Sequence, residues 1–166
     1  HQISATTCGC YAITRKGNVI LLDTYYYSPE GKVNKKAPDE LAKDLHEFIE
    51  KCQTKYNKFA YKITIDSAEG ALKNQYYKDY GTAFHAVAKA KKVDMIDYVQ
   101  NLLAQGRFFY LDTKANQIFI KEHRDYRWDE DTLQSDDPKV IKIADHTCDQ
   151  FQYFVKDNLG DLGLKW

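Results

Sequence analysis

The spacing of apolar residues divides the chain into alternating strand-like and helical segments. Residues 8–14 and 18–27 are rich in strand-forming side chains and are joined by Arg15-Lys16-Gly17, which predicts a β-hairpin with the glycine in its turn. Apolar residues at helical spacing predict helices over residues 38–52, 67–80, 93–105 and 145–159. Short apolar runs predict further strands over residues 59–65, 83–88 and 108–111.

Three segments lack a clear period. Residues 1–7 show no pattern, residues 116–126 fit a helix or a strand equally well, and residues 129–139 are charged and predict an exposed loop. Strands that alternate with helices after a leading hairpin predict an α/β domain with a mixed sheet. A length of 166 residues fits one such domain.

Composition narrows the class of protein only slightly. The chain has 24 basic and 24 acidic side chains, so its zero net charge neither indicates nor excludes nucleic acid as a partner. Lys89, Lys91 and Lys92 form a local basic run, which fits either a phosphate-contacting surface or a solvated loop. The sequence contains no GxxxxGK[ST] phosphate loop, which excludes an ATPase of that type within these residues.

Cysteine spacing and apolar run length bear on the compartment. The four cysteines form no CxxC pair, which favours free thiols in a reducing compartment over a zinc site or a disulfide scaffold. No signal peptide or long apolar run occurs, so we expect neither secretion nor contact with a membrane.

One candidate for chemistry is Asp66, which ends the predicted strand in KITIDSAEG. Catalytic groups of α/β sheets gather beyond the carboxyl ends of strands. The competing interpretation is that Asp66 caps the helix that follows.

A second candidate is the segment from Asp145 to Asp149, where the last helix begins. His146 and Asp149 are three residues apart and project from one face of the first turn, while Asp145 is placed to cap the helix. Acidic residues here can simply complement the helix dipole, but an imidazole beside a carboxylate is typical of metal or phosphate centres. If Asp66 and Asp149 meet at one end of the sheet, they could bind two Mg²⁺ or Mn²⁺ ions for phosphodiester hydrolysis.

The sequence motifs, taken in their order along the chain, resemble those of the C-terminal nuclease domain of phage large-terminase subunits. IDSAEG resembles the family's second metal-binding element, and ADHTCDQFQYF resembles its last element on the closing helix. The intervening similarity is carried by AKAKKVDMIDYVQNLLAQGRFFY and by HRDYRWDED, and upstream by VILLDTYYYSPEGK. The resemblance spans nearly the whole chain.

The resemblance implies an RNase H-like fold, with a mixed sheet flanked by helices, and an endonuclease that cuts concatemeric double-stranded DNA with two Mg²⁺ or Mn²⁺ ions. Asp66 and Asp149 would be metal ligands, and His146 would be an accessory catalytic group. We also expect Lys89, Lys91 and Lys92 to contact DNA phosphates. The implied partners are double-stranded DNA, the terminase small subunit and the portal protein, in the host cytoplasm.

Two departures from the family pattern stand out. IDSAEG has a serine where the family usually has a proline, and Glu69 is then either an auxiliary carboxylate or a solvated residue at the helix start. The family's first metal-binding aspartate lies on a strand just before the loop that matches Ala5-Thr6-Thr7, but no carboxylate precedes Asp23. We therefore expect residues 1–166 to be a single nuclease domain that lacks the ATPase domain and the first, central strand, and to cut DNA slowly or not at all.

Two alternatives remain open. The chain could be a noncatalytic module that binds DNA or a partner in the motor, which would not need a complete set of carboxylates. It could also be another RNase H-like nuclease, such as a junction resolvase.

Overall fold

The computed structural model describes residues 5–164; residues 1–4, which begin the unpatterned segment 1–7, lie outside the described residues, as do residues 165 and 166. The expected hairpin is confirmed: β1 (Thr6–Ile13) pairs antiparallel with β2 (Val19–Tyr27). Gly17 in the turn has φ +80°, a backbone conformation that favours glycine.

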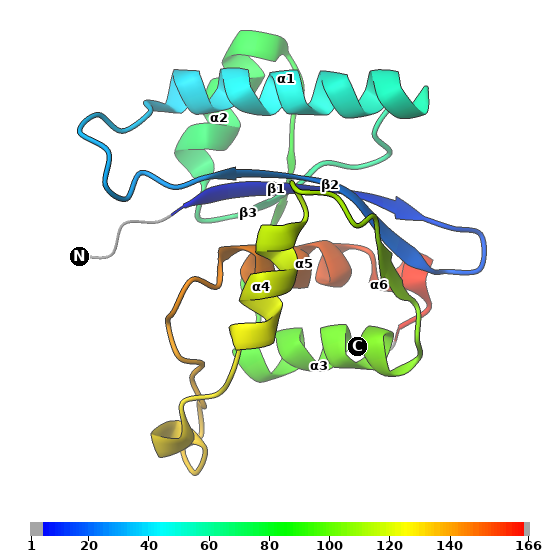
Figure 1. Cartoon of the computed structure of the whole chain (residues 1–166), viewed down its shortest axis with the longest axis vertical. Helices are drawn as coiled ribbons and strands as arrows, with labels where there is room; N and C mark the ends of the chain where they lie inside the picture. The colour runs from blue at the N-terminus through cyan, green and yellow to red at the C-terminus, as the bar shows by residue number, and fades with distance from the viewer. Residues whose placement is uncertain (1–4, 165–166) are drawn as a thin grey trace.

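Helices occupy both sides of the strands (Figure 1). On one side lie α1 (Pro38–Tyr56), which begins at the proline as expected, and α2 (Gly70–Tyr80). The opposite side carries α3 (Lys92–Ala104), α4 (Gln117–Asp125) and α5 (His146–Asp157), followed by the short α6 (Leu159–Leu162). The remaining strands are β3 (Thr64–Asp66), β4 (His85–Val87) and β5 (Phe108–Tyr110). This arrangement of helices around a mixed sheet confirms the predicted fold class.

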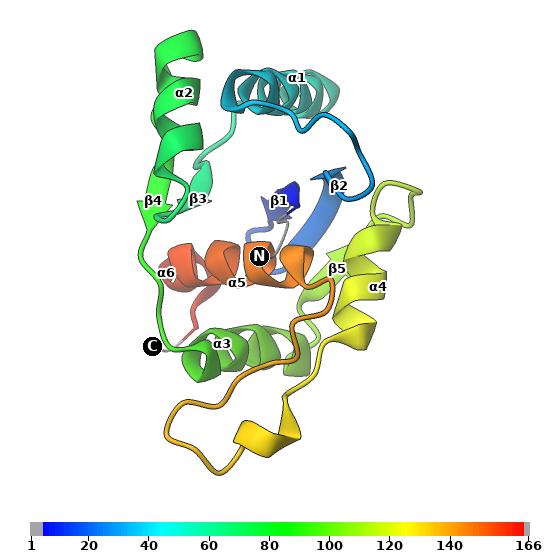
Figure 2. The same cartoon turned by 90° about the vertical axis from the view of Figure 1, so that its left-hand side faces the viewer.

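The described strands form two sheets rather than the single one expected. In the first, β2 lies between β1 and β5, and it runs antiparallel to β1 and parallel to β5. In the second, β3 and β4 are parallel. Among the described residues β1 therefore pairs only with β2 and β3 only with β4, and Figure 2 shows the two pairs side by side above α5.

Several predicted boundaries were wrong. The strand expected over residues 59–65 forms only at residues 64–66, because Phe59 and Tyr61 find no surface to pack on and are 91% and 83% exposed. The helix expected from Ser67 begins at Gly70, and the last helix divides at Asn158. The ambiguous segment 116–126 is helical, and the charged loop 129–139 contains a 3-10 turn, Glu130–Thr132.

A β-bulge decides which residues of β2 face α4 and α5. The register shift between β1 and β2 leaves Leu22 as an extra residue on β2. Leu21, before the bulge, is buried in the core, and Tyr26, after it, bonds to Glu122 of α4 on the same side. Residues an odd number apart on a regular strand would face opposite sides, so the bulge is what turns Tyr26 toward these helices.

The packing of α5 joins the two sheets. A side chain at Gly9 of β1 would bring its Cβ within 2.5 Å of Gln150 Oε1, so glycine permits the close approach of α5 to β1. At its other end, Asp157 accepts hydrogen bonds from Thr64 Oγ1 of β3 at 2.5 Å and from His85 Nδ1 of β4 at 2.9 Å. Since α5 spans from one sheet to the other, it fixes both relative to its own side chains.

Among residues 5–164, no helix is long and apolar enough to cross a membrane.

Candidate functional site

Asp66 lies at the carboxyl end of β3 and is partly exposed. Its Oδ1 accepts a hydrogen bond from the Ala68 N–H at 3.0 Å, and its carbonyl oxygen accepts one from the Glu69 N–H at 2.9 Å. Glu69, not Asp66, holds the N-cap position of α2, so the interpretation of Asp66 as that helix's cap was wrong. The Asp66 carboxylate instead closes the tight turn that follows the strand.

One row of α5 side chains faces the hairpin. The ring of Phe154 stacks on Tyr11 of β1 with centroids 4.1 Å apart, and the Tyr11 hydroxyl donates a hydrogen bond to Gln150. His146, in the first turn of the same row, lies with its ring centroid 6.4 Å from that of Tyr26. The predicted accessory histidine is therefore held at the β2 end of this row.

The neighbouring row of α5, which carries Asp149, faces β3, the strand that ends at Asp66. Tyr153 lies one turn after Asp149, in the row that ends at Asp157. Burial raises the pKa of Tyr153, and the carboxylates of Asp66 and Asp149 raise it further. Two carboxylates from distant parts of the sequence are therefore near enough to Tyr153 to act on its ionisation.

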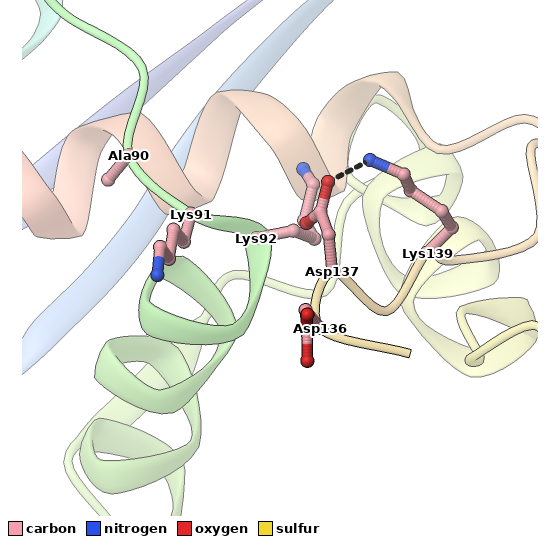
Figure 3. A pocket seen from close by; sticks show the side chains of 6 residues that line it. All are labelled: Ala90, Lys91, Lys92, Asp136, Asp137 and Lys139. Atoms are coloured by element: carbon pink, nitrogen blue, oxygen red, sulfur yellow. Dashed lines mark hydrogen bonds and ion pairs between the residues drawn. The ribbon is translucent and has the colours of Figure 1, made fainter. Parts of the chain in front are cut away.

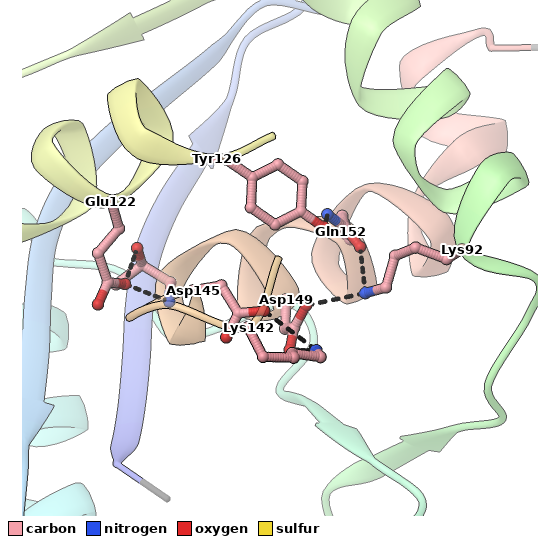
Figure 4. A network of polar contacts seen from close by, with 8 residues as sticks. Lys92, Glu122, Tyr126, Lys142, Asp145, Asp149 and Gln152 are labelled. Atoms are coloured by element: carbon pink, nitrogen blue, oxygen red, sulfur yellow. Dashed lines mark hydrogen bonds and ion pairs between the residues drawn. The ribbon is translucent and has the colours of Figure 1, made fainter. Parts of the chain in front are cut away.

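Two lysines hold Asp149 (Figure 4). Lys92, at the start of α3, places its Nζ 2.8 Å from Asp149 Oδ1 and 3.0 Å from Gln152 Oε1. Lys142 Nζ lies 3.9 Å from Asp149 Oδ2 and 3.0 Å from Asp145 Oδ2. Each carboxylate oxygen of Asp149 thus already has a cation beside it.

The protonation of this network follows from its charges. Burial alone would lower the pKa of the Lys142 ammonium, but the Asp149 and Asp145 carboxylates reverse the effect and raise it. Burial raises the pKa of the Tyr126 hydroxyl, and Asp149 and Asp145 raise it further although its bond with Gln152 opposes them. The site therefore keeps Lys142 charged and Tyr126 neutral at ordinary pH.

The three lysines of the basic run differ in their exposure. Lys89 and Lys91 are exposed, whereas Lys92 is partly buried in its pair with Asp149. Lys91 and Lys92 line one wall of a hollow of about 580 Å³. The residues of the opposite wall come from the loop before α5, and they are Asp136, Asp137 and Lys139, of which the last two form an ion pair (Figure 3). The run thus adjoins the Asp149 network.

The structure corrects the expected helix cap and adds residues that the sequence analysis missed. Asp145 makes no side-chain cap hydrogen bond and pairs with Lys142 instead; the cap comes from Glu122, which accepts from the Thr147 N–H at 2.8 Å. Lys142 could have been found from its spacing of three from Asp145. Glu122 could have been found only after residues 116–126 were assigned as a helix, where it shares a buried face with Phe119.

The donor set fits part of a divalent-cation site. Carboxylate oxygens are the ligands that Mg²⁺ and Mn²⁺ prefer, and the two ammonium groups on Asp149 show that this position attracts positive charge. Within residues 5–164, however, no three acidic, histidine or cysteine side chains are grouped closely enough to hold a metal ion. Asp66 and Asp149 therefore fit as ligands of a cation, and a complete site would need a further oxygen donor.

Comparison with protein families identifies one match. Residues 1–157 match the family described as the terminase RNAseH like domain. No curated protein matched the chain.

Solved structures show the same fold. The large terminase of a thermophilic bacteriophage is 24% identical in sequence, covers 93% of this chain and has a TM-score of 0.79. The same phage protein in complex with ATP-gamma-S is 23% identical, covers 94% of this chain and has a TM-score of 0.76. The chain spans only 37% and 38% of the length of the phage protein in these two structures.

Proposed function

Because the chain belongs to the family of terminase RNase H-like domains, we propose that it is the nuclease domain of a viral DNA-packaging terminase. In this proposal it is a divalent-metal-dependent endodeoxyribonuclease that cuts concatemeric double-stranded DNA. The observation that supports the proposal is that Asp66 ends β3, that the α5 row carrying Asp149 packs against β3, and that both carboxylates are near enough to Tyr153 to raise its pKa. The carboxyl end of a strand is where α/β enzymes place their reacting groups.

Each residue of the site has a role in this proposal. Asp66 and Asp149 bind Mg²⁺ or Mn²⁺; two such ions, when bound, activate water and stabilise the leaving oxygen of a phosphodiester. His146 is an accessory group at the start of α5.

A third carboxylate is expected from a strand between β1 and β3. The family resemblance places the first metal-binding aspartate on such a strand. The edge of β1 away from β2 and the edge of β3 away from β4 have no partner strand among the described residues, and α5 packs under both. Gln150 on α5 also has a buried Nε2 without a hydrogen-bond partner among those residues, and a carbonyl of an added strand could accept from it. We propose that this strand, with an ATPase domain before it, belongs to the longer protein.

The exposed lysines support DNA as the substrate. Lys89 and Lys91 lie at the surface, where they can reach phosphates beside the site, and Lys92 could exchange Asp149 for a phosphate when a divalent ion binds there. In the packaging motor, the domain would act with the terminase small subunit and the portal protein in the host cytoplasm.

A second candidate function is a noncatalytic module that binds DNA or a motor partner. The pairing of both Asp149 oxygens with lysines favours it, because a carboxylate neutralised in this way has a structural use without a metal. Another RNase H-like nuclease, such as a junction resolvase, would share the site but not the motor partners.

Plasmid nicking distinguishes these functions. We expect the chain preceded by a strand with an aspartate to nick supercoiled plasmid in Mg²⁺ or Mn²⁺ without marked sequence preference, and residues 1–166 alone to nick slowly or not at all. If the longer protein binds DNA but never nicks it under any divalent ion, the noncatalytic function is correct. Selective cutting of four-way junctions over linear duplex would identify a resolvase.

A further inference from the structure

Glu122 is a buried carboxylate that joins three elements around the start of α5. The residue is only 2% exposed. Oε1 accepts hydrogen bonds from the Thr147 N–H at 2.8 Å and the Thr147 hydroxyl at 2.6 Å, and Oε2 accepts one from the Tyr26 hydroxyl at 3.1 Å. A buried carboxylate is costly unless its oxygens are hydrogen-bonded, and these three donors supply that compensation.

The contact takes the place of a local helix cap. A cap side chain normally accepts from the N–H of the second or third helical residue, and Thr147 is the second residue of α5. Asp145, in the cap position, is instead turned to Lys142 at 3.0 Å. Glu122 therefore caps α5 from α4, and its negative charge also complements the positive end of the helix. Because this cap belongs to another element, it fixes where α5 begins relative to α4 and β2.

Thr147, to which Glu122 is bonded, lies in the turn of α5 that carries the proposed site residues. Thr147 directly follows His146 and lies two residues before Asp149. It is fully buried, and both its backbone N–H and its hydroxyl bond to Glu122, so a rotation of the helix would break both bonds. Such a rotation would also move Asp149 relative to Asp66, and displacements of about 1 Å are enough to impair a catalytic arrangement.

We propose that Glu122 is a positioning residue, which sets the orientation of α5 and thereby the position of Asp149 relative to Asp66. The inference rests on the proposed function, since it takes Asp149 to be a metal ligand. In this proposal the length of the Glu122 side chain, rather than its charge, sets the orientation of α5. The alternatives are that Glu122 acts through its charge or that it only stabilises the fold.

Two substitutions separate reach from charge. Glu122→Gln keeps the length and the acceptor oxygen but removes the charge, whereas Glu122→Asp keeps the charge and shortens the side chain by one methylene. Thr147→Val, which loses the hydroxyl but keeps the backbone N–H, provides a milder variant if Glu122→Asp folds poorly. Glu130→Gln, at an exposed glutamate, is the matched control.

The experiment uses the chain preceded by a strand with an aspartate, as in the nicking assay, and measures two of its properties by nuclear magnetic resonance. The rate of hydrogen exchange of the Thr147 amide reports how well its hydrogen bond to Glu122 is kept. A Mn²⁺ titration follows paramagnetic broadening of the amide signals of Asp66 and Asp149. We expect wild type, Glu130→Gln and Glu122→Gln to broaden both signals with one shared midpoint. Glu122→Asp should exchange the Thr147 amide faster and need roughly tenfold more Mn²⁺, and Thr147→Val should shift in the same direction by less.

The outcomes that overturn the inference are distinct. If Glu122→Asp speeds exchange at Thr147 but leaves the Mn²⁺ midpoint unchanged, Glu122 only stabilises the fold. If Glu122→Gln shifts the midpoint and Glu122→Asp does not, Glu122 acts through its charge. If Mn²⁺ broadens neither signal in the wild-type extended protein while exchange still responds to the variants, the proposed metal-dependent function fails, and the inference fails with it.

Discussion

The two candidate ligands differ in how the fold holds them. The Asp66 carboxylate bonds to the backbone two residues ahead, within the turn that ends β3. The Asp149 carboxylate is held by Lys92 from α3 and by Lys142 from the loop before α5. Glu122 of α4 in turn fixes the start of α5 by accepting a hydrogen bond from its backbone. One ligand is thus placed by local geometry and the other by long-range contacts.

This difference indicates which part of the site is sensitive to change. A local turn survives substitutions elsewhere in the domain, whereas a network spread over several elements responds to each of them. We therefore expect the α5 side of the site to control cation affinity and the β3 side to act as a fixed reference point.

The largest expected effect comes from removing the charge of Asp149. In the longer protein with an upstream strand, Asp149→Asn should abolish Mg²⁺- or Mn²⁺-dependent nicking, because asparagine keeps the shape but lacks the charge that the cations need. Asp66→Asn should have the same effect, and Glu130→Gln should leave nicking unchanged. Continued cutting by Asp149→Asn would show that the site has been assigned to the wrong residues.

His146 should have an intermediate effect on cutting. His146→Ala in the longer protein should reduce the nicking rate by roughly tenfold without abolishing it, because an accessory group supports the ligands rather than binding the cations itself. A complete loss of nicking in His146→Ala would mean that the imidazole is a ligand, and an unchanged rate would remove it from the site.

A smaller effect is expected from the basic run. Replacement of Lys89, Lys91 and Lys92 by alanine should weaken DNA binding and flatten its salt dependence, by about 0.9 in log–log slope for each phosphate that is no longer neutralised. The control is alanine at the exposed residues Lys35, Lys58 and Lys78, which removes the same charge elsewhere. Equal slopes for the two triple variants, measured by fluorescence anisotropy, would show that the run is only a solvated loop.

The smallest expected effect is on stability, where the two aspartates should differ. Asp149→Asn loses its ion pair with Lys92, which is partly exposed and contributes roughly 1 kcal/mol or less. The melting temperature of a domain of this size should then fall by about 2–4 °C at most. Asp66→Asn keeps an oxygen that accepts from the Ala68 N–H, and its melting temperature should stay near that of the wild type. An equal fall in both variants, measured by calorimetry, would contradict the distinction between local and long-range placement.

The features that could be predicted from the sequence are those that local interactions determine. The hairpin, with its turn at Gly17, was predicted because its pairing is local. The helix start at Pro38 was predicted because its signal lies within one turn. Asp66 and Asp149 could be singled out from their places at a strand end and a helix start.

Features that depend on packing could not be predicted in this way. The alternation from Phe59 to Ile65 suggested a strand, but no neighbouring surface covers the Phe59 ring. Asp145 looked like the cap of α5 because local spacing cannot show that Glu122, on another helix, takes that role. The pairing of Lys92 with Asp149 likewise depends on how α3 packs against α5.

Anomalous diffraction from crystals of the longer protein soaked in Mn²⁺ locates the ion without relying on cutting. We expect a manganese peak between the carboxylates of Asp66 and Asp149, with the Lys92 ammonium displaced from Asp149 Oδ1. A peak at other acidic residues, such as Asp136 and Asp137, with Asp149 still bound to Lys92, would contradict it.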